Sequence, residues 1–230
     1  MSTLRAGAAE VRVTVSQVTV AMRAYFSSYH LHAAKAWTKR AEDIEASYSG
    51  PPRFDIELRS VVSGAVICSV AFLEAAINEL YQDAVDRHLG YCGPLAADKR
   101  DILVGLWAPA RGRDVGLMKK YEAALEAAGT RGLARGRTPY QDAALVIALR
   151  NELVHYRPET LTAASTTRVQ RKLQGRFPPS ALMRGAGNPW FPDHCLGAGA
   201  AAWAVNSSVA FADAFFERLG VVPNSQRVTF

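Results

Sequence analysis

The sequence predicts an all-α protein, a helical bundle with additional peripheral helices. Apolar residues recur at intervals of three and four along most of the chain, which is the period of an amphipathic helix. Proline and glycine clusters, such as Ser49-Gly50-Pro51-Pro52, separate these stretches. Alternation typical of a strand is confined to residues 9–21, so we expect at most one short strand near the N-terminus.

The first two helices are predicted from long apolar patterns. The first is expected from a continuous apolar stripe formed by Met22, Phe26, Tyr29, Ala33, Trp37, Ala41, Ile44 and Tyr48. The second is expected over about 55–88, and its middle, 61–77, is apolar nearly all round, so neighbours should cover it on most sides. Glu74 and Asn78 lie one turn apart on this helix. They either face a cation inside the bundle or point to solvent.

The second half of the chain contains shorter predicted helices. Residues 90–94 break the chain, two helices are expected near 95–107 and 114–128, and a Gly- and Arg-rich linker spans 129–137. Thr138, Pro139 and Gln141 fit a capping box that starts a helix, and Pro158 requires that helix to end near Tyr156. A helix around 166–173 and a last helix over about 197–219, stopped by Gly220, complete the pattern.

Length and composition indicate one globular domain. The chain has 230 residues, 49% hydrophobic and 21% charged, so we expect a lead-in over 1–20, one domain over 21–220 and a tail over 221–230. The beginning lacks the residue order of a signal peptide, and the longest apolar run, 64–77, is short for a bilayer. We therefore expect a cytoplasmic protein that does not contact a membrane.

The cysteines predict neither a metal site nor a disulfide framework. Cys68, Cys92 and Cys195 are odd in number and far apart. The run Asp193-His194-Cys195 could hold a thiol–imidazole nucleophile, but sequence neighbours rarely reach the geometry that this pair needs. We expect no cofactor.

Positive charge is concentrated in one quarter of the chain. Between residues 129 and 184, ten basic residues face only three acidic ones, a net charge of +7, whereas the whole chain carries +6. Solvated helix faces explain such an excess as readily as a surface that binds a polyanion. If the second explanation holds, RNA is the expected partner, and its contacts are expected from Arg131, Arg135, Arg137, Arg157, Arg171 and Lys172.

The most informative motif is the hexapeptide Arg150-Asn151-Glu152-Leu153-Val154-His155, at the end of the helix that begins near Thr138. An imidazole can move a proton, and a guanidinium can neutralise a phosphate during reaction. Positions five apart on an ideal helix are separated by about 140°, so Arg150 reaches His155 only by curving round the helix end. Asn151 and His155 are four apart and share a face.

This run resembles the Arg-x-x-x-x-His signature of the HEPN superfamily (higher eukaryotes and prokaryotes nucleotide-binding). The long helix containing Phe72-Leu73-Glu74-Ala75-Ala76-Ile77-Asn78 and the helix order over about 55–219 are also similar to that family. The resemblance implies a dimeric helical bundle in which two motifs meet. It implies RNA cleavage without metal, as in toxins and anti-phage effectors held by an antitoxin or another regulatory protein.

The resemblance assigns roles to the motif. His155 would remove the ribose 2′-hydroxyl proton, Arg150 would neutralise the phosphate, and Asn151 would orient either group, with Glu74 and Asn78 in support. Arg157 stands where family toxins controlled by nucleotide transfer carry a tyrosine, which argues against that form of control.

Two other functions stay open from the sequence. A fold of the same kind could bind RNA or a nucleotide without cutting it, or could be a helical partner of another protein. If the motif is not catalytic, Arg150 would pair with Glu74 or Glu152, and His155 would only cap its helix.

Overall fold

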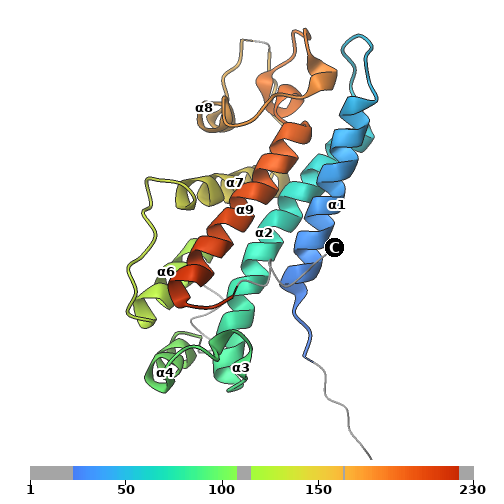
Figure 1. Cartoon of the computed structure of the whole chain (residues 1–230). Helices are drawn as coiled ribbons and strands as arrows, with labels where there is room; N and C mark the ends of the chain where they lie inside the picture. The colour runs from blue at the N-terminus through green and yellow to red at the C-terminus, as the bar shows by residue number, and fades with distance from the viewer. Residues whose placement is uncertain (1–22, 108–114, 163, 223–230) are drawn as a thin grey trace, which may run out of the picture.

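The computed structural model describes residues 23–107, 115–162 and 164–222, which form an all-helical fold (Figure 1). The α-helices are α1 (Phe26–Ala46), α2 (Ile56–Val85), α3 (Leu89–Cys92), α4 (Ala97–Leu106), α6 (Leu117–Ala127), α7 (Tyr140–Val154), α8 (Arg168–Leu173) and α9 (Ala198–Leu219). Two short turns, η1 (Ala181–Met183) and η2 (Trp190–His194), lie between α8 and α9. The described residues contain no strand, so the all-α prediction is confirmed. The strand considered for 9–21 falls outside them.

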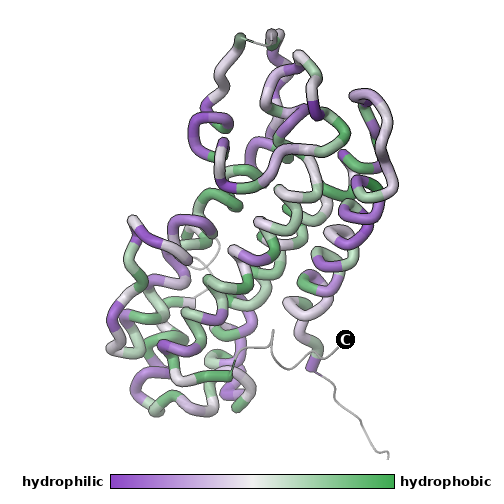
Figure 2. Tube along the Cα trace, turned by 45° about the horizontal axis from the view of Figure 1, so that its top comes forward, coloured by the Kyte–Doolittle hydropathy of each residue, from purple (hydrophilic) through white to green (hydrophobic). Residues whose placement is uncertain are grey.

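Helix α2 runs through the middle of the fold, antiparallel to α1 and parallel to α9 (Figure 1). Its first half packs with the end of α1, the start of α9 and with α7, α8 and η2. Its second half packs with the start of α1, the end of α9 and with α3, α4 and α6. Figure 2 shows hydrophobic residues concentrated along these central helices. The prediction that the middle of this helix is covered is therefore confirmed.

Local residues explain where the long helices begin, approach each other and end. The carboxylate of Asp55 accepts a hydrogen bond from the Leu58 amide at 2.9 Å and caps the start of α2. A Cβ atom at Gly64 would lie 1.6 Å from the Trp37 ring, so only glycine lets α1 lie this close to α2. Gly220 has a φ of 70°, the left-handed conformation that ends α9 as predicted.

Two local predictions are wrong. Residues 90–94 were expected to break the chain, but 90–92 belong to the short helix α3, which the His88 side chain caps by accepting a hydrogen bond from the Gly90 amide. Thr138 does not cap α7, because the Gln141 amide that it would bind already donates to the Arg137 carbonyl at 2.9 Å. Helix α7 therefore begins at Tyr140. The hydroxyl of Tyr140 donates a hydrogen bond to the carboxylate of Glu122 on α6 at 2.7 Å.

Helix α2 is also long and apolar enough, by length and composition, to cross a membrane. The short run at 64–77 is therefore no evidence against a span, because the whole helix has 30 residues. Its most apolar window is 56% buried within the fold, as in the core helix of a soluble protein.

Helix α7 is held on the side of α2 opposite to α1 (Figure 1). Ala143, Val146 and Leu149 recur every three residues and are buried against the bundle. Val169 and Leu173 of α8 are buried in the same cluster, so α8 covers the outer side of α7 near its C-terminal end. This packing leaves the end of α7 between the bundle and α8.

Candidate active site

The hexapeptide forms the last turn of α7 and the residue that follows it. His155 is the C-cap, with φ −108° and ψ 29°, and its backbone N–H donates to the Asn151 carbonyl at 2.9 Å. The chain then leaves the helix before Pro158, as the sequence predicts. The imidazole of His155 is exposed to solvent.

His155 lies on the wall of an open cavity of about 630 Å³. The cations Arg157 and Arg168 line the same cavity, and Tyr156 exposes a ring that lies 6.5 Å from the ring of Phe191. The remaining wall is mainly polar and consists of Glu152, Glu159, Leu161, Thr166, Thr167 and Val169. An imidazole, two guanidinium groups and an aromatic ring can bind a nucleotide through its phosphate and base.

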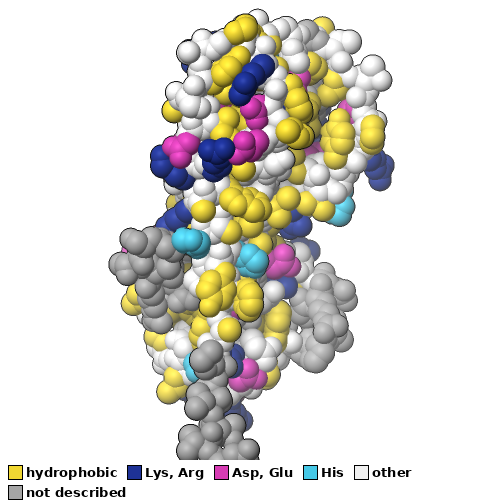
Figure 3. Space-filling model, turned by 90° about the vertical axis from the view of Figure 1, so that its right-hand side faces the viewer, with side chains coloured by type: hydrophobic (Ala, Val, Ile, Leu, Met, Phe, Trp, Pro, Cys, Tyr) yellow, Lys and Arg dark blue, Asp and Glu magenta, His cyan; other side chains and the backbone are white. Residues whose placement is uncertain are grey.

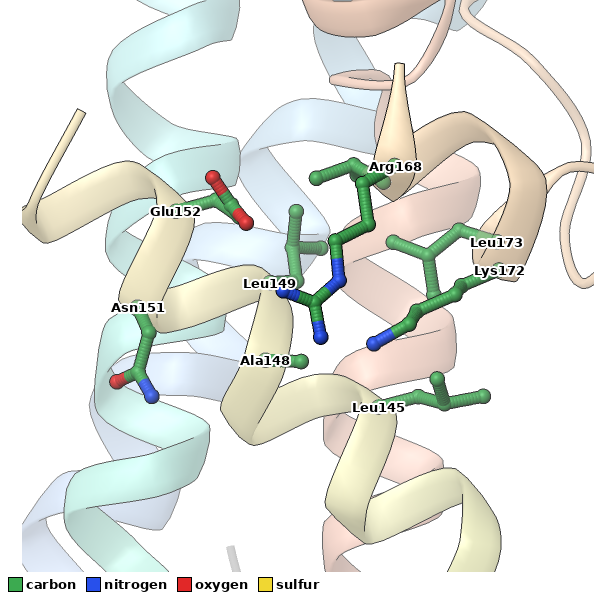
Figure 4. A pocket seen from close by; sticks show the side chains of 9 residues that line it. Leu145, Ala148, Leu149, Asn151, Glu152, Arg168, Lys172 and Leu173 are labelled. Atoms are coloured by element: carbon green, nitrogen blue, oxygen red, sulfur yellow. The ribbon is translucent and has the colours of Figure 1, made fainter. Parts of the chain in front are cut away.

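A second pocket, of about 200 Å³, lies between α7 and α8 (Figure 4). The side chains of Arg168 and Lys172 extend from α8 into it, and the carboxylate of Glu152 points toward it from α7. Leucine side chains form the apolar part of the wall, and Asn151 lies at the edge with its amide directed away from Lys172 (Figure 4). Glu152, Arg168 and Val169 line both spaces, so the pocket adjoins the cavity of His155.

Arg150 lines neither space. It follows Val146 by one helical turn and therefore lies on the side of α7 that packs against α2. Its Nε–H is buried and has no hydrogen-bond partner among the described residues, and no ion pair joins Arg150 to Glu74 or Glu152 there. Within one protomer the structure thus does not bring Arg150 and His155 to a common cavity.

The supporting residues expected on α2 face a different neighbour. Asn78 accepts a hydrogen bond from Lys120 of α6 at 3.0 Å, and that ammonium group lies 5.1 Å from the centre of the Trp107 ring. Burial lowers the pKa of Lys120, and the nearby carboxylate of Glu74, which is itself exposed, partly opposes this shift. Glu74 and Asn78 therefore belong with Lys120, not with Arg150.

The basic residues expected to contact RNA divide into two groups. Arg157 and Lys172 line the two spaces at the C-terminal end of α7, and Arg171 lies beside them with its guanidinium bonded to the Thr166 carbonyl at 3.2 Å. Arg131, Arg135 and Arg137 precede the other end of α7, and its 15 residues separate the groups by about 22 Å. Arg135 is ion-paired with Glu122 at 2.8 Å.

The run Asp193-His194-Cys195 attaches the segment before α9 to α2. Asp193 pairs with Arg59 of α2 at 2.5 Å and accepts a hydrogen bond from Asn188 at 2.6 Å. Cys195 is buried, and burial raises the pKa of its thiol. These contacts favour the interpretation that this segment is structural. In the described part of the chain, no group of three His, Cys, Asp or Glu side chains is arranged to hold a metal ion.

Sequence reasoning did not assign Arg168 and Glu152 to the site. The sequence does indicate that Arg168 accompanies Lys172, because the two are four apart in the helix predicted around 166–173 and thus share one face. The sequence does not show that this face turns toward the end of α7. That information comes only from the packing of Val169 and Leu173.

No family model matches the chain, and searches of curated proteins and of solved structures found no match either.

Proposed function

We propose that the protein is an endoribonuclease that cleaves RNA by attack of a ribose 2′-hydroxyl on the adjacent phosphorus, and that it is a HEPN-type domain. The observation that carries the proposal is the exposed His155 in an open cavity that Arg157 and Arg168 also line. An imidazole beside two guanidinium groups combines a proton acceptor with phosphate binding.

In this mechanism His155 accepts the 2′-hydroxyl proton, and the 2′-oxygen forms a bond to phosphorus. The bond from phosphorus to the 5′-oxygen breaks, and that oxygen takes a proton from the protonated His155 of the second copy in a homodimer. The products are a 2′,3′-cyclic phosphate and a free 5′-hydroxyl. Arg157 and Arg168 hold the phosphate, and Tyr156 can stack on a flanking base. DNA lacks the attacking hydroxyl and is not cleaved.

Arg150 enters this mechanism through a homodimer. Its buried Nε–H has no acceptor within the described residues of one protomer, and an unsatisfied buried donor is costly. Arg150 is half-buried, so its side chain would have to turn outward from α2 to reach a phosphate bound between two protomers. That phosphate would then supply the acceptor, with Arg150 from one copy and His155 from the other. Asn151, exposed in the same turn, would orient the phosphate.

The dimer that this mechanism needs must form through α7. Val154 is half-exposed at the end of α7 and would be covered in such a dimer. Figure 3 shows hydrophobic side chains exposed on the opposite side of the molecule. Phe26 and Tyr29 of α1 are among the exposed apolar residues. Because α1 and α7 lie on opposite sides of α2, a dimer through α1 would keep the two motifs apart.

Sedimentation of Val154→Glu and Tyr29→Glu variants distinguishes these two faces. We expect Val154→Glu to weaken self-association and cleavage together, and Tyr29→Glu to leave both unchanged. The reverse result, or a monomer at micromolar concentration in the unsubstituted protein, contradicts the shared site.

The test of catalysis is cleavage of mixed RNA in EDTA by the purified protein. We expect His155→Ala to lower the rate by about 10²–10⁴-fold, the usual contribution of acid–base catalysis. His30→Ala, which changes a histidine on α1, is the matched control and should retain full activity. Cleavage that persists in His155→Ala, or that stops with EDTA, contradicts the mechanism.

The second candidate is a module that binds RNA or a nucleotide without cutting it. The separation of Arg150 from the cavity of His155 within one protomer favours this candidate. It predicts RNA binding that weakens with salt, because phosphate contacts release counterions. It also predicts that neither the unsubstituted protein nor His155→Ala cleaves RNA.

A role as a toxin or anti-phage effector, held by an antitoxin or another regulatory protein, is part of the proposal. Induced expression should then arrest growth, and His155→Ala should abolish the arrest at equal protein level.

A further inference from the structure

The pocket between α7 and α8 has two cations on its α8 side, and neither forms an ion pair with a carboxylate among the described residues. Arg168 and Lys172 are four apart on α8 and both extend into the pocket (Figure 4). Neither side chain has an ion pair or hydrogen bond with any described residue. Glu152, which points toward the same space, is also without a partner there. A guanidinium and an ammonium group that extend into one pocket and are not engaged in an ion pair are suited to bind a phosphate.

The opposite side of the pocket is apolar. Leu145, Leu149 and Leu173 line it, and Leu149 and Leu173 are buried among the bundle residues. A flat ring can lie against such a surface, as bases do on apolar and aromatic side chains of RNA-binding proteins. The pocket of about 200 Å³ therefore offers a phosphate site and a base site within the reach of one nucleotide.

Glu152 lies where it can select among bases. A carboxylate has only acceptor atoms. Guanine presents two adjacent donors, the N1–H and the N2 amino group, on its Watson–Crick edge, and these match the two carboxylate oxygens. Adenine and cytosine place a ring acceptor beside their amino donor, and uracil places carbonyl groups on both sides of its N–H. Those acceptors would repel a carboxylate.

We propose that this pocket binds a guanine nucleotide, with its phosphate on Arg168 and Lys172 and its base between the leucine side chains and Glu152. Because Arg168 and Glu152 also line the cavity of His155, the pocket sets the base next to the scissile phosphate. The inference deepens the proposed ribonuclease function and rests on it for its role in cleavage. The binding step itself does not require cleavage.

The experiment is calorimetric titration of the full chain carrying His155→Ala with 5′-GMP, guanosine, 5′-AMP and 5′-UMP. We expect 5′-GMP to bind at least about tenfold more tightly than each of the others, the effect of one charge-assisted contact. Equal affinity for the three nucleotides, or no binding of 5′-GMP, overturns the proposal.

Three further variants identify the groups responsible. Lys172→Met should weaken 5′-GMP by about tenfold and leave guanosine unchanged, whereas Glu152→Gln should remove the preference over 5′-AMP. Lys119→Met is the matched control, because Lys119 is also an exposed lysine but lies on α6 and does not line the pocket. A loss of 5′-GMP affinity as large in Lys119→Met as in Lys172→Met overturns the assignment. Circular dichroism of each variant verifies folding.

The cleavage assay keeps this inference separate from the proposed function. Binding of 5′-GMP without cleavage by the unsubstituted protein retains the pocket and rejects the nuclease. Cleavage after all four bases alike, without binding of 5′-GMP, retains the nuclease and rejects the pocket.

Discussion

The two ends of α7 carry arginines in different surroundings. Before the N-terminal end, Arg135 is ion-paired with Glu122, and the adjacent cavity of about 350 Å³ is lined by Glu122 and Glu126. At the C-terminal end, Arg157, Arg168 and Lys172 line the two spaces beside His155 without any ion pair among the described residues. Basic residues that look alike in the sequence therefore differ in whether their charge is already paired with a carboxylate or is available to bind an anion.

The carboxylates explain this difference. Burial opposes ionisation of Glu122, but hydrogen bonds from Tyr140 and Arg135 outweigh it and lower its pKa. The same hydrogen bond from Tyr140 ties α7 to α6. The charge of Arg135 is thus already paired with Glu122 within the protein. Glu152 and Glu159 at the other end have no such partners among the described residues.

After His155, the largest expected effect concerns Arg150. We expect Arg150→Met to lower RNA cleavage by about 10²–10³-fold, as when one group that stabilises transition-state charge is removed. The thermal midpoint should not fall, because the buried Nε–H has no partner to lose within the described residues. Arg137→Met, at the other end of α7, is the control. If both variants cleave at the normal rate, Arg150 has no role in the site.

A pair of triple variants tests the comparison directly through the salt dependence of RNA binding. Each phosphate contact to single-stranded RNA contributes about 0.7 to the slope of log affinity against log salt, so neutralising Arg157, Arg168 and Lys172 should reduce that slope by about 2. Neutralising Arg131, Arg135 and Arg137 should change it less, since Arg135 is already paired. Equal losses would mean that RNA follows both ends of the helix.

The wall of the pocket depends on the cap of α8. Thr167 accepts a hydrogen bond from the Gln170 amide at 3.1 Å, so Thr167→Ala should destabilise α8 by about 1 kcal/mol. Hydrogen exchange should then accelerate in residues 168–173 and not in α6. Thr167→Ser, which keeps the hydroxyl, should restore protection. Uniform acceleration throughout the chain would contradict a local effect.

The smallest effect should come from Glu122→Gln, which makes the two ends more alike. Releasing Arg135 should raise RNA affinity by about two- to threefold, the size of a surface ion pair.

The same variant has a defined pH dependence. Because the folded pKa of Glu122 is lowered, its carboxylate stabilises the fold fully above the ordinary value of 4.5. That stabilisation disappears as the pH falls through the folded pKa. The difference in thermal midpoint between the unsubstituted protein and Glu122→Gln should therefore vanish at acid pH. A difference that stays constant with pH would contradict the pairing.

The helices could be predicted from sequence because their signals are local. Apolar patterns predict α1 and α2, and Gly220 and Pro158 mark the ends of α9 and α7. The start of α7 could not be predicted, because the competing acceptor for the Gln141 amide is the carbonyl of Arg137 in the preceding turn. Local sequence shows which groups can cap a helix, but not which of them are already occupied.

The candidate site was harder to predict than the helices. The motif gave His155 at the end of α7, whereas the positions of its neighbours depend on contacts between distant segments. Asn78 meets Lys120, 42 residues away, and Arg168 reaches the site only because α8 packs on α7. A charge excess shows that cations are present, and the fold decides which of them have counterions.

The segment that forms the outer wall, from Tyr156 to Gln174, is nearly self-contained. It carries its own helix cap at Thr167 and its own Thr162–Ser165 hydrogen bonds, and α8 is anchored mainly by two buried side chains, Val169 and Leu173. Such a segment can accept substitutions, insertions or exchange with another sequence while the remaining helices keep their packing. Selectivity toward a ligand could therefore diverge rapidly among descendants of this protein, while the histidine and the scaffold that presents it stay the same.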